Sequence, residues 1–427
     1  MARKRAPKPV HAPEPPAEQT GITVPVETVV LVLTCLCYVA CSAYLCTAIV
    51  RGDSPDEAAH LEYIHRLAAD FHLIDFRGEP KGTETHQPPL YYALGALVAL
   101  ASGHSLLALR LLSTLCGLGS LWLAYRLAQA WLPGRGFGLH WACAVVVGFL
   151  PMNLYVCSAV NNDPLVNLLV AAGLLCLWRS RRGAGGARRA LMCGGVAGLA
   201  MLTKSTALAL VVCGAVLYVV EVLSVPRAER SFRRPAAFLA GFLAVWGWWG
   251  VRNTLLYGDP LAAAAFSSLA AGAPAQELGA PGAAYWLGMV APFTWMTFWG
   301  AYDHLIHPDD FMPTWWYLLL APVVAVAALG VVERFRRGLE REALPWVLAL
   351  AAGLLVLLAG FVGFNLNVFQ AQARYFFCFL PVLAIALCAG MVWCGRHVAR
   401  AGVITLLVLL AYGSLEGVAW RMWFTGP

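Results

Sequence analysis

The first long apolar run of the chain and the polar segment that follows it, residues 24–60, read VPVETVVLVLTCLCYVACSAYLCTAIVRGDSPDEAAH. The run Val24–Val50 is long enough to cross a bilayer, which takes about 20 predominantly apolar residues. Two carboxylates, Asp56 and Glu57, stand shortly after its end. Acids placed where a span leaves the membrane can act on a lipid head group, so this segment predicts a membrane enzyme.

The composition of the whole chain supports an integral membrane protein. Of its 427 residues, 60% are hydrophobic and only 12% are charged, unlike a soluble globular domain. Residues 1–21 are rich in Pro and basic residues and have no apolar run, so we expect a disordered cytosolic tail followed by a single membrane domain over residues 22–427. The 13 cysteines lie in apolar runs, which favours buried small hydrophobes over disulfides or metal ligands.

The apolar runs predict an all-α polytopic membrane protein with eleven spans. They are Val24–Val50, Leu106–Trp131, Leu139–Cys157, Leu165–Trp178, Ala190–Thr203, Thr206–Leu223, Pro235–Leu256, Trp315–Val332, Ala343–Phe364, Tyr375–Cys394 and Ala401–Trp420. Most basic residues, including those within 179–189, 227–234 and 334–341, fall on one side of this arrangement. Since basic loops stay in the cytosol, the N-terminus is expected there and the acids of residues 51–105 outside.

The first outer loop, residues 51–105, is expected to carry two helices that lie on the membrane. Ser54-Pro55-Asp56-Glu57 has the form of a capping box, with Pro55 at the first helical position. The apolar stretch Pro88–Ser102 is short for a span, and we expect it to lie at the interface with Leu90, Tyr91, Leu94, Leu97 and Val98 toward acyl chains.

Asp56 and Glu57 have two interpretations. Acids are favoured in the first turn of any helix, and a carboxylate at the membrane surface can also act as a general base. His60, one turn after Asp56, together with Glu84 and His86 of the same loop, could contact an acceptor or a sugar. A divalent cation is a further alternative, although the spacing matches no fixed set of metal ligands.

Three cations stand at the outer ends of different predicted spans. Lys204, Arg252 and Arg374 are therefore candidates for binding a lipid phosphate, with Tyr375 next to Arg374. The alternative for each is a charge that reaches the lipid head groups. Asp163, in the turn Asn161-Asn162-Asp163, could cap the following helix or contact a sugar.

The second large outer segment, residues 257–314, combines small residues with a dense aromatic group. Its aromatics, between Tyr285 and Tyr302, suit an interfacial belt or a surface that stacks on sugar rings. Five titratable residues follow, which could bind an acceptor or form a solvated loop: Asp303, His304, His307, Asp309 and Asp310.

Several motifs follow one another in an order that resembles the order in a known family. They are the acidic pair after the first span, Thr85-His86-Gln87-Pro88-Pro89-Leu90-Tyr91-Tyr92, Leu109-Arg110-Leu111, Asn161-Asn162-Asp163-Pro164, Leu202-Thr203-Lys204-Ser205-Thr206, Arg252-Asn253 before Tyr257-Gly258-Asp259-Pro260, and Gln372-Ala373-Arg374-Tyr375-Phe376. From about residue 25 to 400 the chain resembles the polyprenyl-phosphate-sugar-dependent glycosyltransferases of the GT-C fold, specifically the bacterial relatives of protein O-mannosyltransferases and lipid A aminoarabinose transferases.

The resemblance implies an inverting transferase that uses a polyprenyl phosphate sugar. The acid at the end of the first span would be the general base, a role that falls on Asp56 or Glu57, with Asp56 preferred. The acceptor would be a hydroxyl on a lipid-linked molecule, a glycan or a protein, at the outer face of a bacterial inner membrane. Many relatives carry a soluble domain at the C-terminal end, and its absence after Trp420 favours a small or lipid-linked acceptor.

Other functional classes fit less well. The chain has no Walker loop and no Rossmann glycine fingerprint, which argues against direct use of a nucleotide sugar. Its net charge of +7 comes mostly from the cytosolic arginines and requires no nucleic acid. The alternative is a transporter or flippase of lipid-linked sugars. Transporters commonly contain internal repeats, whereas this chain shows none and its acids cluster at the surface.

Overall fold

The computed structural model describes residues 25–424 except 81, 183–185, 264, 267–273, 280–281, 303–310 and 339. These residues form helices and two isolated β-bridges, so the predicted all-α class is confirmed. The helices are α1 Val26–Ala48, α2 Glu57–Asp70, α3 Leu90–Ser102, α4 Leu106–Trp131, α5 Phe137–Phe149, α6 Pro151–Cys157, α7 Asp163–Arg182, α8 Gly186–Met201, α9 Leu208–Leu223, α10 Arg233–Tyr257, α12 Ala283–Tyr285, α13 Ala291–Trp299, α14 Thr314–Arg336, α15 Leu344–Asn365, α16 Leu380–Trp393 and α17 Arg396–Phe424. Short 3₁₀ turns at Ser205–Ala207 and Ala373–Phe379 precede α9 and α16.

In the described part of the chain, eight helices are long and apolar enough to cross a membrane, or nine if the bent pair α5 and α6 counts as one span. The predicted count of eleven is therefore not confirmed. Helix α8, with 16 residues, is short for a span. The predicted span Leu139–Cys157 is bent by 59°. The bend comes at Pro151, which has no N–H to continue the ladder of α5.

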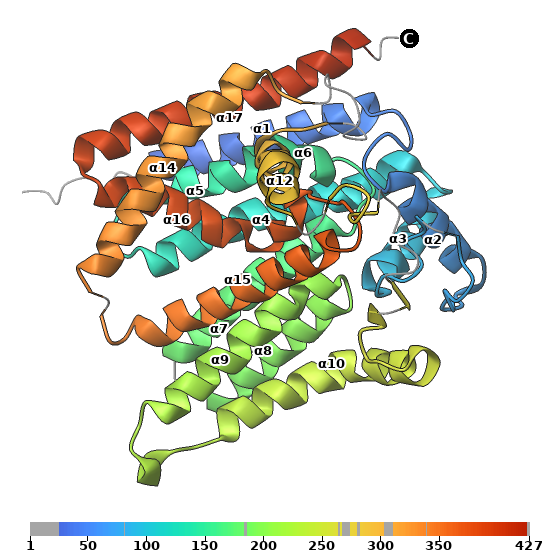
Figure 1. Cartoon of the computed structure of the whole chain (residues 1–427), viewed down its shortest axis with the longest axis horizontal. Helices are drawn as coiled ribbons and strands as arrows, with labels where there is room; N and C mark the ends of the chain where they lie inside the picture. Colours follow the sequence, from blue (N-terminus) through green and yellow to red (C-terminus); the bar gives the residue numbers. More distant parts are fainter. Residues whose placement is uncertain are drawn as a thin grey trace, which may run out of the picture.

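Close helix pairs build the bundle (Figure 1), with α8 against α10, α9 against α15 and α14 against α16. A side chain at Gly194 of α8 would clash with the Phe238 carbonyl of α10, and one at Gly241 with the Leu191 carbonyl. Small residues allow such close backbone approach between membrane helices.

The basic ends of several helices meet at one end of the bundle. Glu221 at the end of α9 pairs with Arg181 of α7 at 3.2 Å and with Arg234 of α10 at 3.0 Å. Helices α2 and α3 lie at the other end, on the right in Figure 1. The bundle thus has a basic end and an end that carries the first loop.

The two helices of the first loop are present, but two details of the prediction are wrong. Helix α2 begins at Glu57, and no side chain caps it, so Ser54 and Pro55 do not form a capping box. Tyr91 of α3 is fully buried and lies 2.9 Å from the Ser113 hydroxyl, because α3 packs on α2 and α4. Leu97, on the other face of α3, is 56% exposed.

Candidate functional site

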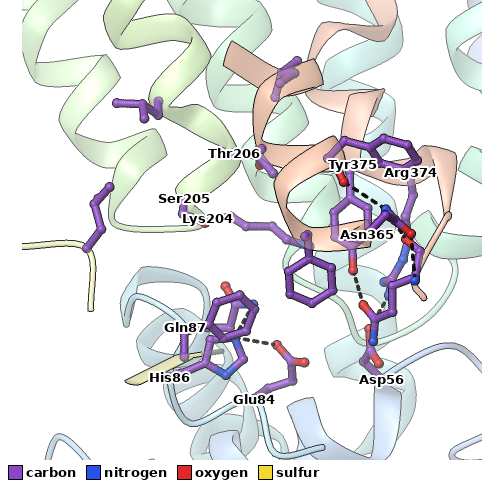
Figure 2. Close-up of a pocket in the computed structure, with 18 of the residues that line it drawn as sticks. Asp56, Glu84, His86, Gln87, Lys204, Ser205, Thr206, Asn365, Arg374 and Tyr375 are labelled. Carbon is purple, nitrogen blue, oxygen red and sulfur yellow. Dashed lines mark hydrogen bonds and ion pairs between the residues drawn. The ribbon is translucent and has the colours of Figure 1, made fainter. Parts of the chain in front are cut away.

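Asp56 occupies the turn between α1 and α2 in an unusual backbone conformation. Its φ of 65° is left-handed, a region that Asp visits more readily than most residues and that recurs at functional sites. The side chain is 39% exposed and lines a cavity. Its Oδ2 accepts a hydrogen bond from the Arg374 guanidinium (Figure 2). The turn therefore directs this carboxylate into an accessible site.

Glu57, the next residue, is completely buried and does not line the cavity. Both of its oxygens accept from Arg110, at 2.9 Å and 2.6 Å. It also accepts from the N–H groups of Gly52 and Val160. Arg110 in turn donates to the carbonyls at the end of α1. This pair joins α1, α2, α4 and the turn before α7, so Glu57 has the surroundings of a structural clamp.

Asp163 links the two cations of the cavity. The Lys204 ammonium lies 2.5 Å from its Oδ1, and Arg374 lies 3.5 Å from its Oδ2. All three residues are buried. Asn161 accepts from the Asp163 N–H at 2.9 Å and so orders the start of α7. Two carboxylates, Asp56 and Asp163, therefore balance two cations that come from distant parts of the sequence.

Tyr375 packs against both cations. Its ring centre lies 5.7 Å from the Lys204 Nζ and 5.8 Å from the Arg374 guanidinium carbon, within the range of cation–π contacts. Its hydroxyl donates to Gln370 at 2.6 Å. Asn365, at the end of α15, accepts from the Gln370 N–H at 2.9 Å. These contacts hold the ring and the guanidinium in place at the polar end of the cavity.

Glu84 and His86 lie on the opposite side of the same cavity. His86 Nδ1 is 3.1 Å from the Thr83 carbonyl, and its ring stacks on Phe266 with centres 4.2 Å apart. Burial, followed by the charge of Asp56, raises the pKa of Glu84 to about 8. Burial lowers the pKa of His86 to about 4. Near neutral pH both side chains are therefore uncharged.

Asp56 responds to opposing influences. Burial alone raises its pKa, but the charges of Arg374 and of neighbouring groups hold the pKa below its usual value. The carboxylate is thus ionised while it is paired with Arg374. A base of such low pKa is weak, because general-base catalysis is most efficient when the pKa lies near the working pH.

Arg252 and His60, like Glu57 and Asp163, are predicted site residues that do not line the cavity. Arg252 donates to the Ile74 carbonyl at 2.7 Å and lies over the Trp249 ring at 4.8 Å, so only two of the three outer cations converge. His60 is buried, with Nδ1 2.9 Å from the Tyr92 hydroxyl, and burial lowers its pKa to about 3.

Two further predictions concern the titratable residues within 303–310 and a possible metal site. Asp303, His304, His307, Asp309 and Asp310 lie outside the described residues. Among the described residues, no group of three or more His, Cys, Asp or Glu side chains is arranged to hold a metal ion.

The cavity itself has a volume of about 300 Å³. Its polar end contains Asp56, Glu84, His86, Lys204 and Arg374, and Figure 2 shows these side chains facing one another. An apolar wall continues from it, formed by Leu208 of α9 and by Val356, Leu357, Gly360, Phe361 and Phe364 of α15. Neither this wall nor Asn365 is predicted from the sequence, in which Asn365 is marked only as an amide that follows an apolar span. A charged end that continues into an apolar groove suits a ligand with an anionic head and a lipid chain.

Comparison with known proteins identifies the fold. The structure is similar to ArnT from Cupriavidus metallidurans bound to undecaprenyl phosphate, with a TM-score of 0.56 and 16% identity over 91% of this chain and 64% of that one. The apo state of ArnT gives a TM-score of 0.55 and 16% identity over 94% of this chain and 76% of that one. The chain has the GT-C fold.

Other comparisons agree with the GT-C fold. An Archaeoglobus fulgidus oligosaccharyltransferase tethered to an acceptor peptide gives a TM-score of 0.51 and 12% identity over 94% of this chain and 56% of that one. The chain thus spans less than two thirds of two of these three structures. Residues 86–248 match the family model of dolichyl-phosphate-mannose-protein mannosyltransferases. No curated protein matches the chain.

Proposed function

We propose that this GT-C chain is a membrane glycosyltransferase that moves a sugar from a polyprenyl phosphate donor to a hydroxyl acceptor. One observation carries the proposal. The accessible carboxylate of Asp56 and two buried cations, Lys204 and Arg374, share the polar end of a cavity whose other wall is apolar. A base for an acceptor and cations for a phosphate are what transfer from a glycosyl phosphate requires.

The donor would bind with its phosphate at Lys204 and Arg374 and its lipid along the wall between α9 and α15. Arg374 can hold a phosphate bidentately, and Lys204 adds a point charge. The ring of Tyr375, next to both cations, offers a surface for the sugar. The bound undecaprenyl phosphate of the ArnT structure supports a ligand of this class.

In the proposed reaction, Asp56 removes the proton of the acceptor hydroxyl while the hydroxyl oxygen attacks the anomeric carbon. The bond between that carbon and the phosphate oxygen breaks, and its electron pair stays on the phosphate. Lys204 and Arg374 stabilise the charge that develops there. Direct displacement inverts the anomeric centre. No step of this reaction needs a metal ion.

The ion pair between Asp56 and Arg374 suggests how the donor prepares the base. The donor phosphate competes with Asp56 for Arg374, whose charge keeps the pKa of Asp56 low. When the phosphate takes over the guanidinium, the pKa of Asp56 rises and the carboxylate becomes a stronger base. Proton removal would therefore become efficient only with the donor bound.

The proposed location is a bacterial inner membrane with the N-terminus in the cytosol. The basic ends of α7, α9 and α10 would face the cytosol, and the cavity beside α2 would open outside. The acceptor would be a hydroxyl of a lipid-linked molecule, a glycan or a protein.

The test uses the purified full chain in lipid nanodiscs with a panel of polyprenyl phosphate sugars and hydroxyl acceptors. Loss of the carrier-bound sugar and formation of a glycosylated product are followed for the wild type and for Asp56→Asn. Asp70→Asn is the matched control, because Asp70 is an exposed acid at the end of α2. Turnover that Asp56→Asn abolishes and Asp70→Asn retains supports the proposal.

The transporter alternative gives a different result when the same purified chain is reconstituted into liposomes. If the wild type moves a labelled polyprenyl phosphate sugar across liposomes and forms no glycosylated product with any acceptor, the transferase proposal is wrong. If product forms equally fast with Asp56→Asn, the assignment of the base is wrong.

A further inference from the structure

A cluster of three arginines lies at the basic end of the bundle, far from the candidate site that contains Asp56. Helix α7 carries Asp163 of the site at its start and Arg179 near its end. At 1.5 Å per residue this places them about 24 Å apart along the axis. Arg179, Arg189 of α8 and Arg126 of α4 line a cavity of about 560 Å³. This cavity is therefore distinct from the proposed active site.

The cavity is strongly positive. It is lined by three guanidinium groups and by no acid. In the described part of the chain, none of the three arginines forms an ion pair; Arg126 lies over the Trp122 ring at 5.7 Å, and Arg189 donates to the Arg179 carbonyl at 3.4 Å. Arg179 and Arg189 are exposed, and Arg126 is half-buried. All three border one hollow that Trp178 also lines.

An apolar groove adjoins this cavity. A hollow of about 510 Å³ between α1 and α4 shares Arg126 and Gln129 with it. Its wall includes Leu31 and Leu36 of α1 and Tyr125 of α4, and Glu27 is its one acid. Arg126 thus stands between a basic cavity and an apolar groove at the same end of the bundle.

We propose that an anionic phospholipid of the surrounding bilayer binds here. Its phosphate lies among Arg126, Arg179 and Arg189, and an acyl chain follows the groove between α1 and α4. Basic pockets between membrane helices bind anionic head groups, and arginine matches phosphate geometry. Three arginines against one glutamate favour an anionic lipid over a zwitterionic one. The proposal does not depend on the glycosyltransferase function.

The test measures lipids retained by the purified full chain in native mass spectrometry, after mixing with phosphatidylglycerol, phosphatidylethanolamine or phosphatidylcholine. We expect the wild type to retain phosphatidylglycerol preferentially. Arg126→Gln and Arg189→Gln should each weaken this binding about tenfold, as expected when one charge-assisted contact is lost. Arg188→Gln is the matched control, since Arg188 precedes Arg189 on α8, is exposed and does not line the cavity. Size-exclusion profiles verify that all variants are folded.

Each other outcome overturns the proposal. Equal retention of the three lipids means that the cavity does not select an anionic head group. An equal loss in Arg188→Gln means that only the overall charge of this end matters. If inorganic phosphate displaces phosphatidylglycerol at similar concentration, the arginines form a site for free phosphate and the groove holds no acyl chain.

Discussion

At the scale of single residues, a carboxylate can act as a base only where a substrate hydroxyl can reach it. Asp56 meets this condition, because its side chain is 39% exposed to the cavity. Glu57 does not, since four hydrogen-bond contacts occupy its buried oxygens. Substitution of Asp56 should therefore lower the turnover, whereas substitution of Glu57 should lower the stability of the protein.

Asp56→Asn should lower the turnover of a polyprenyl phosphate sugar by about 100-fold or more, the range expected for a lost general base. Its thermal unfolding temperature should stay close to that of the wild type, because Asp56 is accessible. Product formation and thermal unfolding, measured on the same preparation, check both parts.

Glu57→Gln should mainly destabilise the protein. Removing one partner of a buried, hydrogen-bonded ion pair costs about 3–5 kcal/mol, because Arg110 remains as an uncompensated buried charge. Thermal unfolding in detergent measures this loss. A variant of normal stability and no activity would contradict the clamp and return Glu57 to the role of base.

Glu84 should give the reaction a pH dependence. Its pKa is raised to about 8, so the carboxyl is neutral below this pH and becomes negative above it. The added charge repels the donor phosphate, and kcat/KM should therefore fall as the pH rises through about 8. Glu84→Gln should remove this decrease, and Glu62→Gln, an exposed acid on α2, should retain it. A rise of kcat/KM through the same pH that Glu84→Gln abolishes would instead make Glu84 the base.

At the scale of helices, the position of Lys204 depends on how closely α8 packs. Gly194 leaves no room for a side chain against Phe238 of α10, whereas Gly195 meets only ordinary contact. Gly194→Ala should destabilise the protein by about 1–3 kcal/mol, and Gly195→Ala should be neutral or stabilising by up to about 1 kcal/mol. Thermal unfolding of the pair compares them directly. Equal effects of both substitutions would show that the close contact of α8 and α10 does not limit stability.

At the scale of the whole molecule, the two ends of the bundle should lie on opposite sides of the membrane. Asp70, exposed on α2, and Arg230, half-buried between α9 and α10, mark these ends. In intact cells an impermeant maleimide should label Asp70→Cys, and it should label Arg230→Cys only after permeabilisation. The wild-type chain, with its 13 cysteines, measures the background. Labelling of both variants from the same side would refute the proposed topology.

Composition and the length of the apolar runs suffice to predict the all-α membrane class, whereas the predicted count of eleven spans is not confirmed. Long apolar runs can satisfy their backbone groups in lipid only as helices, so composition and run length suffice for this level. The ends of helices do not follow from run length alone. The capping pattern at Ser54 was overridden by the turn that carries Asp56 and by the buried contacts of Glu57.

Tertiary packing selects which polar residues come together. Lys204 and Arg374 meet through Asp163 although they are far apart in the chain, while Arg252 turns to Ile74 and lies outside the cavity. The same holds for Asp56 and Glu57, which are adjacent in sequence and face different surroundings. Which side chains converge depends on how helices pack and in which direction each turn points, and neither is encoded in local spacing.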